Sequence, residues 1–150
     1  MKKTVLVVTL LAGLAPPPAW AAGAKERCYS PAAIEAEQAI RFMTDLMVVS
    51  STCRDTIYAQ FRLRNQTPIL AYQKAMIAHF RSTTAFDSWN TSVANAAARK
   101  QAGLPSVQVC QQAAELLKKA SALDPSAFRQ YAAARAATVG ATYPKCGKRR

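Results

Sequence analysis

The chain has 150 residues, of which 51% are apolar, and its 20 basic and 8 acidic residues give a formal net charge of +12. This length suits one ordinary domain with a buried core, and no stretch reaches the ~20 apolar residues that a membrane-spanning helix needs. We therefore predict no transmembrane segment, and the basic balance favours anionic neighbours.

The first residues have the features of a secretory signal peptide. Two lysines precede a short apolar run, and Ala19-Trp20-Ala21 supplies a small-x-small cleavage site. We therefore predict a signal peptide over residues 1–21, with Ala24 as an alternative cleavage point. Removing residues 1–21 leaves 129 residues with 18 basic and 8 acidic side chains, a formal charge of +10. The mature protein is expected to be exported, either periplasmic or extracellular.

A long helix is predicted over residues 31–53, after a short N-terminal extension over residues 22–30. Ser30 and Pro31 are typical of a helix start, because a serine oxygen caps free amides and proline needs no donor at the first helical position. Apolar residues then recur at three- and four-residue spacing, which places them on one face. This core face consists of Ala39, Phe42, Met43, Leu46, Met47, Val49 and Ser50.

The opposite face of this helix is predicted to be solvated. It carries Glu37, Arg41 and Asp45, which are spaced four apart with alternating sign, so that each side chain can pair with the next. The helix is therefore expected to be amphipathic and to form the central element of the fold.

Capping residues and prolines predict four more helices after residue 53. The first begins at Asp55 and is hinged at Thr67-Pro68, which either kinks it or starts a new helix. The others are expected over residues 84–102, 105–123 and 125–140, with Thr84 and Asp124 as caps. In the helix over residues 105–123, the inward face is predicted to be Val107, Cys110, Ala114, Leu117 and Ser121.

These elements predict an all-α fold, an antiparallel bundle of about five helices over residues 31–140. Short loops return the chain to its neighbour, so successive helices are expected to alternate in direction, with the last parallel to the first. A basic C-terminal tail over residues 141–150 follows the bundle.

The four cysteines, Cys28, Cys53, Cys110 and Cys146, are an even number in an exported chain and predict two disulfides. A continuous helix over residues 31–53 would be about 34 Å long, whereas bridged cysteines need Cα atoms within ~7 Å. Cys28 and Cys53 therefore cannot pair with each other. In an antiparallel bundle Cys53 and Cys110 lie near the same end, so we predict the pairs Cys53–Cys110 and Cys28–Cys146.

Several positions carry a resemblance to known proteins: the run TDLMVVSSTC over residues 44–53, then Tyr58, Phe61, Ala94-Asn95 and Cys110. In these positions the chain resembles small exported helical proteins of proteobacteria with paired cysteines, a group without an assigned activity. The resemblance implies the helical fold and the exported compartment. It brings no catalytic or ligand-binding residues.

Basic residues of the hinged helix and the tail offer a candidate anion-binding surface. They are Arg54, Arg62, Arg64, Lys145, Lys148, Arg149 and Arg150. The expected partners are anionic envelope components, such as lipopolysaccharide or phospholipid head groups, or another protein, and no nucleic acid is expected. The competing interpretation is a solvated basic surface without a specific ligand, because Arg62 and Arg64, two apart, diverge on a helix.

A soft-metal site is the alternative hypothesis. If the first helix and the hinged helix meet face to face, three thioethers and an imidazole would converge, a set suited to Cu(I). These residues are Met43, Met47, Met76 and His79. The competing interpretation is that methionines at helical spacing fill gaps in the core.

We expect a non-enzymatic envelope protein with a binding or structural role, and predict no cofactor. A hydrolase ranks third among the hypotheses. Nucleophilic catalysis would depend on His79, the single histidine, and no Gly-x-Ser-x-Gly motif accompanies it. No catalytic residue is therefore predicted.

Overall fold

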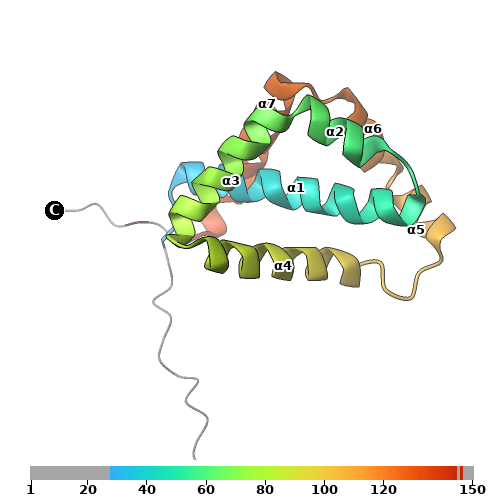
Figure 1. Cartoon of the computed structure of the whole chain (residues 1–150), viewed down its shortest axis with the longest axis horizontal. Coiled ribbons are helices and arrows are strands. Elements are labelled where there is room, and N and C mark those ends of the chain that lie inside the picture. The colour runs from blue at the N-terminus through green and yellow to red at the C-terminus, as the bar shows by residue number, and fades with distance from the viewer. Residues whose placement is uncertain (1–27, 145, 147–150) are drawn as a thin grey trace, which may run out of the picture.

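The computed structural model describes residues 28–144 and residue 146, and this part of the chain is all-α without a strand (Figure 1). The predicted all-α fold is confirmed, with seven α-helices in the described residues rather than about five. The elements are α1 Pro31–Cys53, α2 Ile57–Arg64, α3 Gln66–Phe80, α4 Thr83–Arg99, α5 Ser106–Gln112, α6 Ala114–Ala122, α7 Pro125–Val139 and the 3₁₀ helix η1 Gly140–Thr142. None of the described helices has the length and apolar character that crossing a membrane requires. The predicted signal peptide, residues 1–21, lies outside the described residues.

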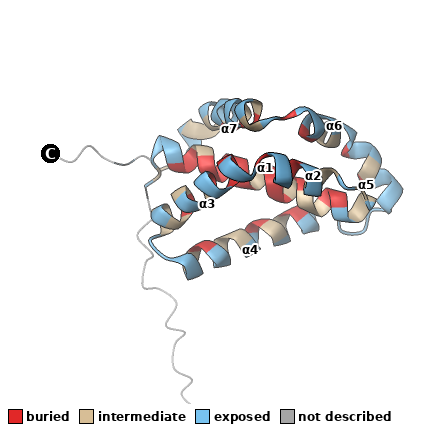
Figure 2. Ribbon diagram, turned by 45° about the horizontal axis from the view of Figure 1, so that its top comes forward, coloured by how far each residue is buried: buried red, intermediate tan, exposed pale blue. Residues whose placement is uncertain are grey.

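Helix α1 is the central element, and each of α2 to α7 contacts it. Its start has the predicted cap, because the Ser30 Oγ accepts a hydrogen bond from the Ala33 N–H at 3.2 Å and Pro31 lies in the first turn. The helix ends at Arg54, whose left-handed φ of 56° stops the helical path. Figure 2 shows buried residues along most of α1, as expected for a helix enclosed by others.

The predicted solvated face of α1 is wrong at Glu37, which is only 2% exposed. Neighbouring helices pack against α1 from several sides, so no wide face of it remains in water. The Arg41 Nε does pair with the Glu37 Oε1, at 2.7 Å, but the Asp45 Oδ1 pairs with the Nζ of Lys100, the residue directly after α4, at 3.2 Å. The predicted series of surface ion pairs along α1 is therefore absent. One half-buried pair within α1 and one pair to Lys100 are present in its place.

The predicted hinged helix is two helices, because the chain bends at Asn65. This residue is fully buried, and its Nδ2 donates to the carbonyl oxygens of Phe61 and Leu123, both at 3.1 Å. The second bond ties the bend to the end of α6, and α2 and α3 consequently meet at an angle (Figure 1). We refer to α2, α3 and the bend between them as the α2–α3 elbow.

The single helix predicted over residues 105–123 is also two helices, since regular helix is interrupted at Ala113. The inward face predicted for this segment is wrong at Val107, Ala114 and Ser121, which are exposed, whereas Leu117 packs against the core as predicted. Val109 is buried and Cys110 is bridged to α1, which puts Val107, two residues before Val109, on the other side, 65% exposed. Beyond the interruption, the buried residues are Ala113, Ala120 and Leu123.

The predicted N-cap of α4 is wrong, and the predicted N-cap of α7 is confirmed. The cap of α4 is Ser82 rather than Thr84, because the Ser82 Oγ accepts the Ala85 N–H at 3.2 Å. At α7 the predicted cap holds, and the Asp124 Oδ1 accepts two backbone N–H groups of the first turn, each at 2.8 Å.

Two bent paths flank α1 (Figure 1). The α2–α3 elbow runs back toward the start of α1, and α5, α6 and α7 together do the same. Phe128, near the start of α7, packs against Phe61 with ring centroids 4.9 Å apart, whereas Tyr143, beyond the end of α7, donates to Glu37 near the start of α1. The last helix therefore runs opposite to α1 rather than parallel to it, because α6 and α7 share one return path.

The core lies between α1 and these two paths. Its centre is a triangle of buried rings from three helices, with centroid distances of 5.7 Å for Phe42 and Phe61, 4.9 Å for Phe61 and Phe128, and 6.1 Å for Phe42 and Phe128. Aromatic pairs at such distances contribute beyond their buried area. The rings therefore hold the elbow and α7 against the middle of α1.

Both predicted disulfides are confirmed. Cys53 and Cys110, with Cα atoms 5.6 Å apart, join the end of α1 to α5. Cys28 and Cys146, with Cα atoms 4.6 Å apart, join the two ends of the described chain. The bundle is thus closed covalently at both ends of α1.

We expect the Cys53→Ala/Cys110→Ala double variant to lose much of its stability. The bridge spans 57 positions in sequence, and restricting a loop of this length in the unfolded chain contributes about 4 kcal/mol to the free energy of unfolding. Urea unfolding of the oxidised wild type and the variant measures the difference. A loss below about 1 kcal/mol would contradict this role, because it is smaller than the usual range for native disulfides.

Candidate functional site

A groove is associated with the α2–α3 elbow. One cavity, of about 420 Å³, is lined by residues of α2 and α3, including Leu63 and Leu70. A second cavity, of about 210 Å³, lies where the elbow meets α1 and α4. Four residues line both cavities, so the two are adjacent: Tyr58, Arg62, Ile69 and Gln73. We refer to the two together as the elbow groove.

Helical spacing and a hydrogen bond to α1 position the groove residues. Tyr58 and Arg62 are four apart on α2, and Ile69 and Gln73 are four apart on α3, so each pair shares one face. At the start of α2, the Ser50 Oγ accepts the Tyr58 N–H at 3.3 Å, which fixes the helix against α1. The Arg62 guanidinium carbon lies 5.7 Å from the centre of the Tyr58 ring, a cation–π arrangement that limits where the charge can point.

The electrostatics of the elbow are wholly basic. Residues 56–86 contain Arg62, Arg64, Lys74 and Arg81 and no aspartate or glutamate. The ion pairs of the described residues lie on α1 and α4, so Arg62 has no carboxylate partner within the described part of the chain. Its charge is therefore directed at the groove and at solvent.

Arg64, in contrast, has a structural role at the end of α6. Its Nε donates to the Leu123 carbonyl at 3.0 Å, and its Nη2 donates to the carbonyls of Ala120 and Ser121 at 2.9 and 3.1 Å. The last carbonyl groups of a helix have no partner within it, and a cation there also suits the helix dipole. Arg64 thus joins the elbow to α6.

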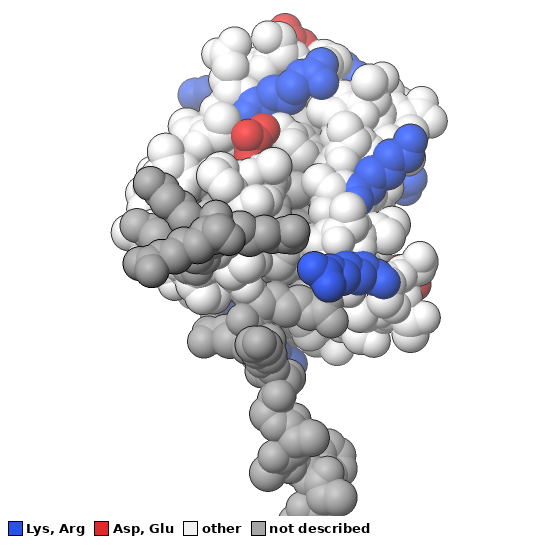
Figure 3. Space-filling model, turned by 90° about the vertical axis from the view of Figure 1, so that its left-hand side faces the viewer, with Lys and Arg blue, Asp and Glu red and all other residues white. Residues whose placement is uncertain are grey.

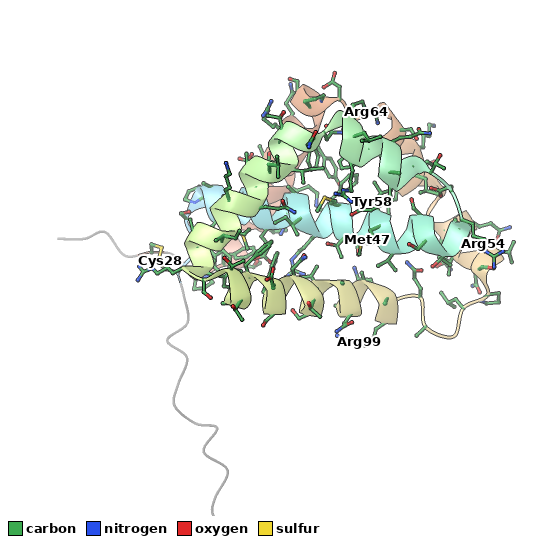
Figure 4. All side chains as sticks on the ribbon, viewed as in Figure 1. Cys28, Met47, Arg54, Tyr58, Arg64 and Arg99 are labelled. Atoms are coloured by element: carbon green, nitrogen blue, oxygen red, sulfur yellow. A yellow bond between two sulfur atoms is a disulfide. The ribbon has the colours of Figure 1, made fainter. Side chains whose placement is uncertain are left out.

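The structure does not bring Arg54, Arg62 and Arg64, the described members of the predicted anion-binding set, to one surface. Arg54 and Cys28 lie at opposite ends of α1 (Figure 4), and the tail is bridged to Cys28. On the face where α1 begins, basic side chains are separated by uncharged surface (Figure 3). The tail residues Lys145, Lys148, Arg149 and Arg150 lie outside the described residues. Of the described set, Arg62 is the residue that lines the groove.

The four predicted metal ligands are divided between two places. Met43 and Met47 line the second cavity of the groove with Tyr58. Met76 is fully buried in the core, and the His79 ring lies 4.2 Å from the ring of Tyr29. Neither Met76 nor His79 lines either cavity of the groove. The described residues also contain no cluster of three His, Cys, Asp or Glu side chains fit to hold a metal.

The buried Glu37 forms a second polar assembly, which we name the terminal cluster: Glu37, Gln38, Arg41, Tyr29 and Tyr143. The Tyr143 hydroxyl donates to the Glu37 Oε1 and accepts from the Gln38 Nε2, both at 2.9 Å. Burial, followed by the hydrogen bond to the Glu37 carboxylate, raises the pKa of Tyr143. Burial and the charge of Glu37 raise the pKa of Tyr29 to about 12. Both phenols therefore stay protonated beside the carboxylate.

The chain ends hold this cluster in place. The Tyr29 N–H donates to the Pro144 carbonyl at 2.9 Å, next to the Cys28–Cys146 bridge, and the rings of Tyr29 and Tyr143 lie 4.8 Å apart. A carboxylate that is taken out of water is stable only with such donors around it. The polar residues of the terminal cluster are therefore explained by their role in stabilising the fold. No such role explains the elbow groove.

No protein-family model, curated protein or solved structure matches this chain. The function has to be inferred from the groove. Sequence reasoning singled out Arg62, Met43 and Met47, but it missed Gln73 and Asn90 as groove residues. The signal that could have pointed to the elbow is the long stretch without an acidic residue, 56–86.

Replacing Arg64 with methionine is expected to lower the free energy of unfolding by about 2 kcal/mol, because several hydrogen bonds from a charged group are lost. The matched control is Arg62→Met, two residues away on the same helix, which should change stability by less than about 0.5 kcal/mol. Urea unfolding measures both. Equal losses in the two variants would show that Arg64 has no special role at the end of α6.

The stability of the protein should fall in alkali as the terminal cluster ionises. The pKa of Tyr29 is raised from 10.0 to about 12, so the folded protein retains a proton that the unfolded chain releases in this interval. Its contribution to stability is therefore complete below pH 10 and is lost as the pH rises toward 12. Urea unfolding across this range should give a shallower decline for Tyr29→Phe. Identical slopes for the variant and the wild type would refute the assignment.

Proposed function

We propose that the protein is an exported, non-enzymatic binding protein that holds an anionic amphiphile in the elbow groove. The predicted signal peptide over residues 1–21 supports export, and the two disulfides fit an oxidising compartment. The observation that carries the proposal is the position of Arg62. Its guanidinium lines a groove of mixed apolar and polar side chains and has no carboxylate partner among the described residues.

The groove offers both halves of an amphiphile a suitable surface. A guanidinium presents a planar set of donors that matches a carboxylate or phosphate, and its packing on the Tyr58 ring orients it. Met43, Met47 and Ile69 supply flexible apolar contacts for a chain or ring. The amide of Gln73 adds a neutral donor and acceptor that lines both cavities.

The test is isothermal titration of the full exported chain with dodecanoate below its critical micelle concentration. Arg62→Gln should weaken binding by about tenfold or more, since a hydrogen bond to a charged group contributes at least about 1.5 kcal/mol. Arg99→Gln, an exposed arginine of α4 that lies outside the groove (Figure 4), is the matched control and should bind as the wild type does.

Two further ligands separate the contribution of the anionic head group from that of the apolar chain of dodecanoate. Dodecyltrimethylammonium has the same chain with a cationic head and should bind more weakly, because Arg62 repels it. Inorganic phosphate has the anionic head alone and should also bind more weakly. If dodecanoate binds the Arg62→Gln and Arg99→Gln variants equally, the groove is not the site and the proposal fails.

A further inference from the structure

The α2–α3 elbow exposes two large apolar side chains. Leu63 is 80% exposed and Leu70 is 49% exposed, and both belong to the lining of the elbow groove. They flank the bend at Asn65, so they come from the end of α2 and the start of α3. Because these two exposed leucines lie beside a groove, we expect a partner surface to cover them.

The charges beside these leucines have one sign. Arg62 precedes Leu63, and Lys74 follows Leu70 by four residues, which places Lys74 on the same face of α3. Arg62 and Lys74 are both exposed, and residues 56–86 contain no acidic side chain. Glu35, the carboxylate that reaches α3 from α1, accepts a hydrogen bond from the Tyr72 hydroxyl at 2.8 Å. The exposed surface of the elbow therefore combines apolar tips with unopposed positive charge.

We propose that the α2–α3 elbow docks on an anionic lipid bilayer, with Leu63 and Leu70 among the head groups and Arg62 and Lys74 against lipid phosphates. Apolar side chains flanked by basic ones are the composition of a surface that lies on a membrane without crossing it. A protein partner of matching charge would need acidic groups arranged around an apolar patch, whereas a bilayer with anionic lipids supplies both features over any area.

This docking goes beyond the proposed function, because it assigns a partner surface rather than a bound molecule. It also places the mouth of the groove against the lipids, since Leu63, Leu70 and Arg62 line the same cavity. An amphiphile could then pass between the bilayer and the groove without crossing water.

The experiment is sedimentation of the full exported chain with vesicles of phosphatidylcholine alone and of phosphatidylcholine with phosphatidylglycerol. We expect binding to the anionic vesicles that weakens with added salt, and at least tenfold weaker binding of the Leu63→Gln/Leu70→Gln variant. The matched control is Leu104→Gln/Val107→Gln, which alters the two other large apolar residues that the described chain exposes, 37% and 65% exposed, and should bind as the wild type does.

Lys74→Gln tests the charge separately and should weaken binding to the anionic vesicles about fivefold, the usual effect of one lysine near such a surface. Docking is overturned if no vesicle binds, if neutral vesicles bind equally well, or if the two double variants behave alike. Titration of the Lys74→Gln variant with monomeric dodecanoate keeps the two proposals apart, because Lys74 lines neither cavity of the elbow groove. Retained dodecanoate binding with weakened vesicle binding supports docking, whereas unchanged vesicle binding of Lys74→Gln contradicts the proposed contact of Lys74 with lipid phosphates.

Discussion

The enclosure of α1 by the other six α-helices of the described chain is the constraint on which the rest of the structure depends. A helix packed on several sides buries many of its polar residues, which therefore need hydrogen-bonding partners within the helix or from other segments. Glu37 is the sharpest case, because a carboxylate is costly to bury. The chain ends meet this need with the hydroxyl of Tyr143, and a disulfide fixes that arrangement.

Two of the paths that cover the 23-residue central helix change direction as they follow it, whereas α4 lies alongside it as one unbroken helix (Figure 1). The bends fall at Asn65 and around Leu123, and a hydrogen bond joins the two residues. Arg64 adds bonds at the same junction, so the two flanking paths are fastened to each other where each one turns.

Local signals in the sequence were sufficient for the starts of α1 and α7, and the fixed length of a helix was sufficient to exclude one disulfide pairing. Ser30-Pro31 and Asp124-Pro125 begin helices because their side chains and proline rings act within a single turn, independently of tertiary structure. The length of a continuous helix excluded a bridge between Cys28 and Cys53, and the choice between the two remaining pairings followed from the antiparallel order expected of the helices. These features depend on few residues and on fixed helical geometry.

Features that depend on which helices meet could not be predicted in this way. Glu37 has the spacing of a surface residue, and only the approach of Tyr143 from more than a hundred positions away makes it a buried one. The sequence alone predicts a solvated cation at Arg64, and only the structure shows that α6 ends beside it. The elbow groove likewise draws residues from four helices, and its shape is set by the bend at Asn65.

The pairing of Cys28 with Cys146 makes the described chain a closed covalent ring, and Cys53–Cys110 is a cross-link inside it. A protease that cuts one peptide bond between residues 28 and 146 therefore opens the ring without releasing a fragment. A cut in the connection between α4 and α5, where Gly103 turns at a φ of 80°, would leave both new ends attached to a bundle still joined at each end of α1. In a compartment rich in proteases, such a molecule can be nicked and yet keep its parts together.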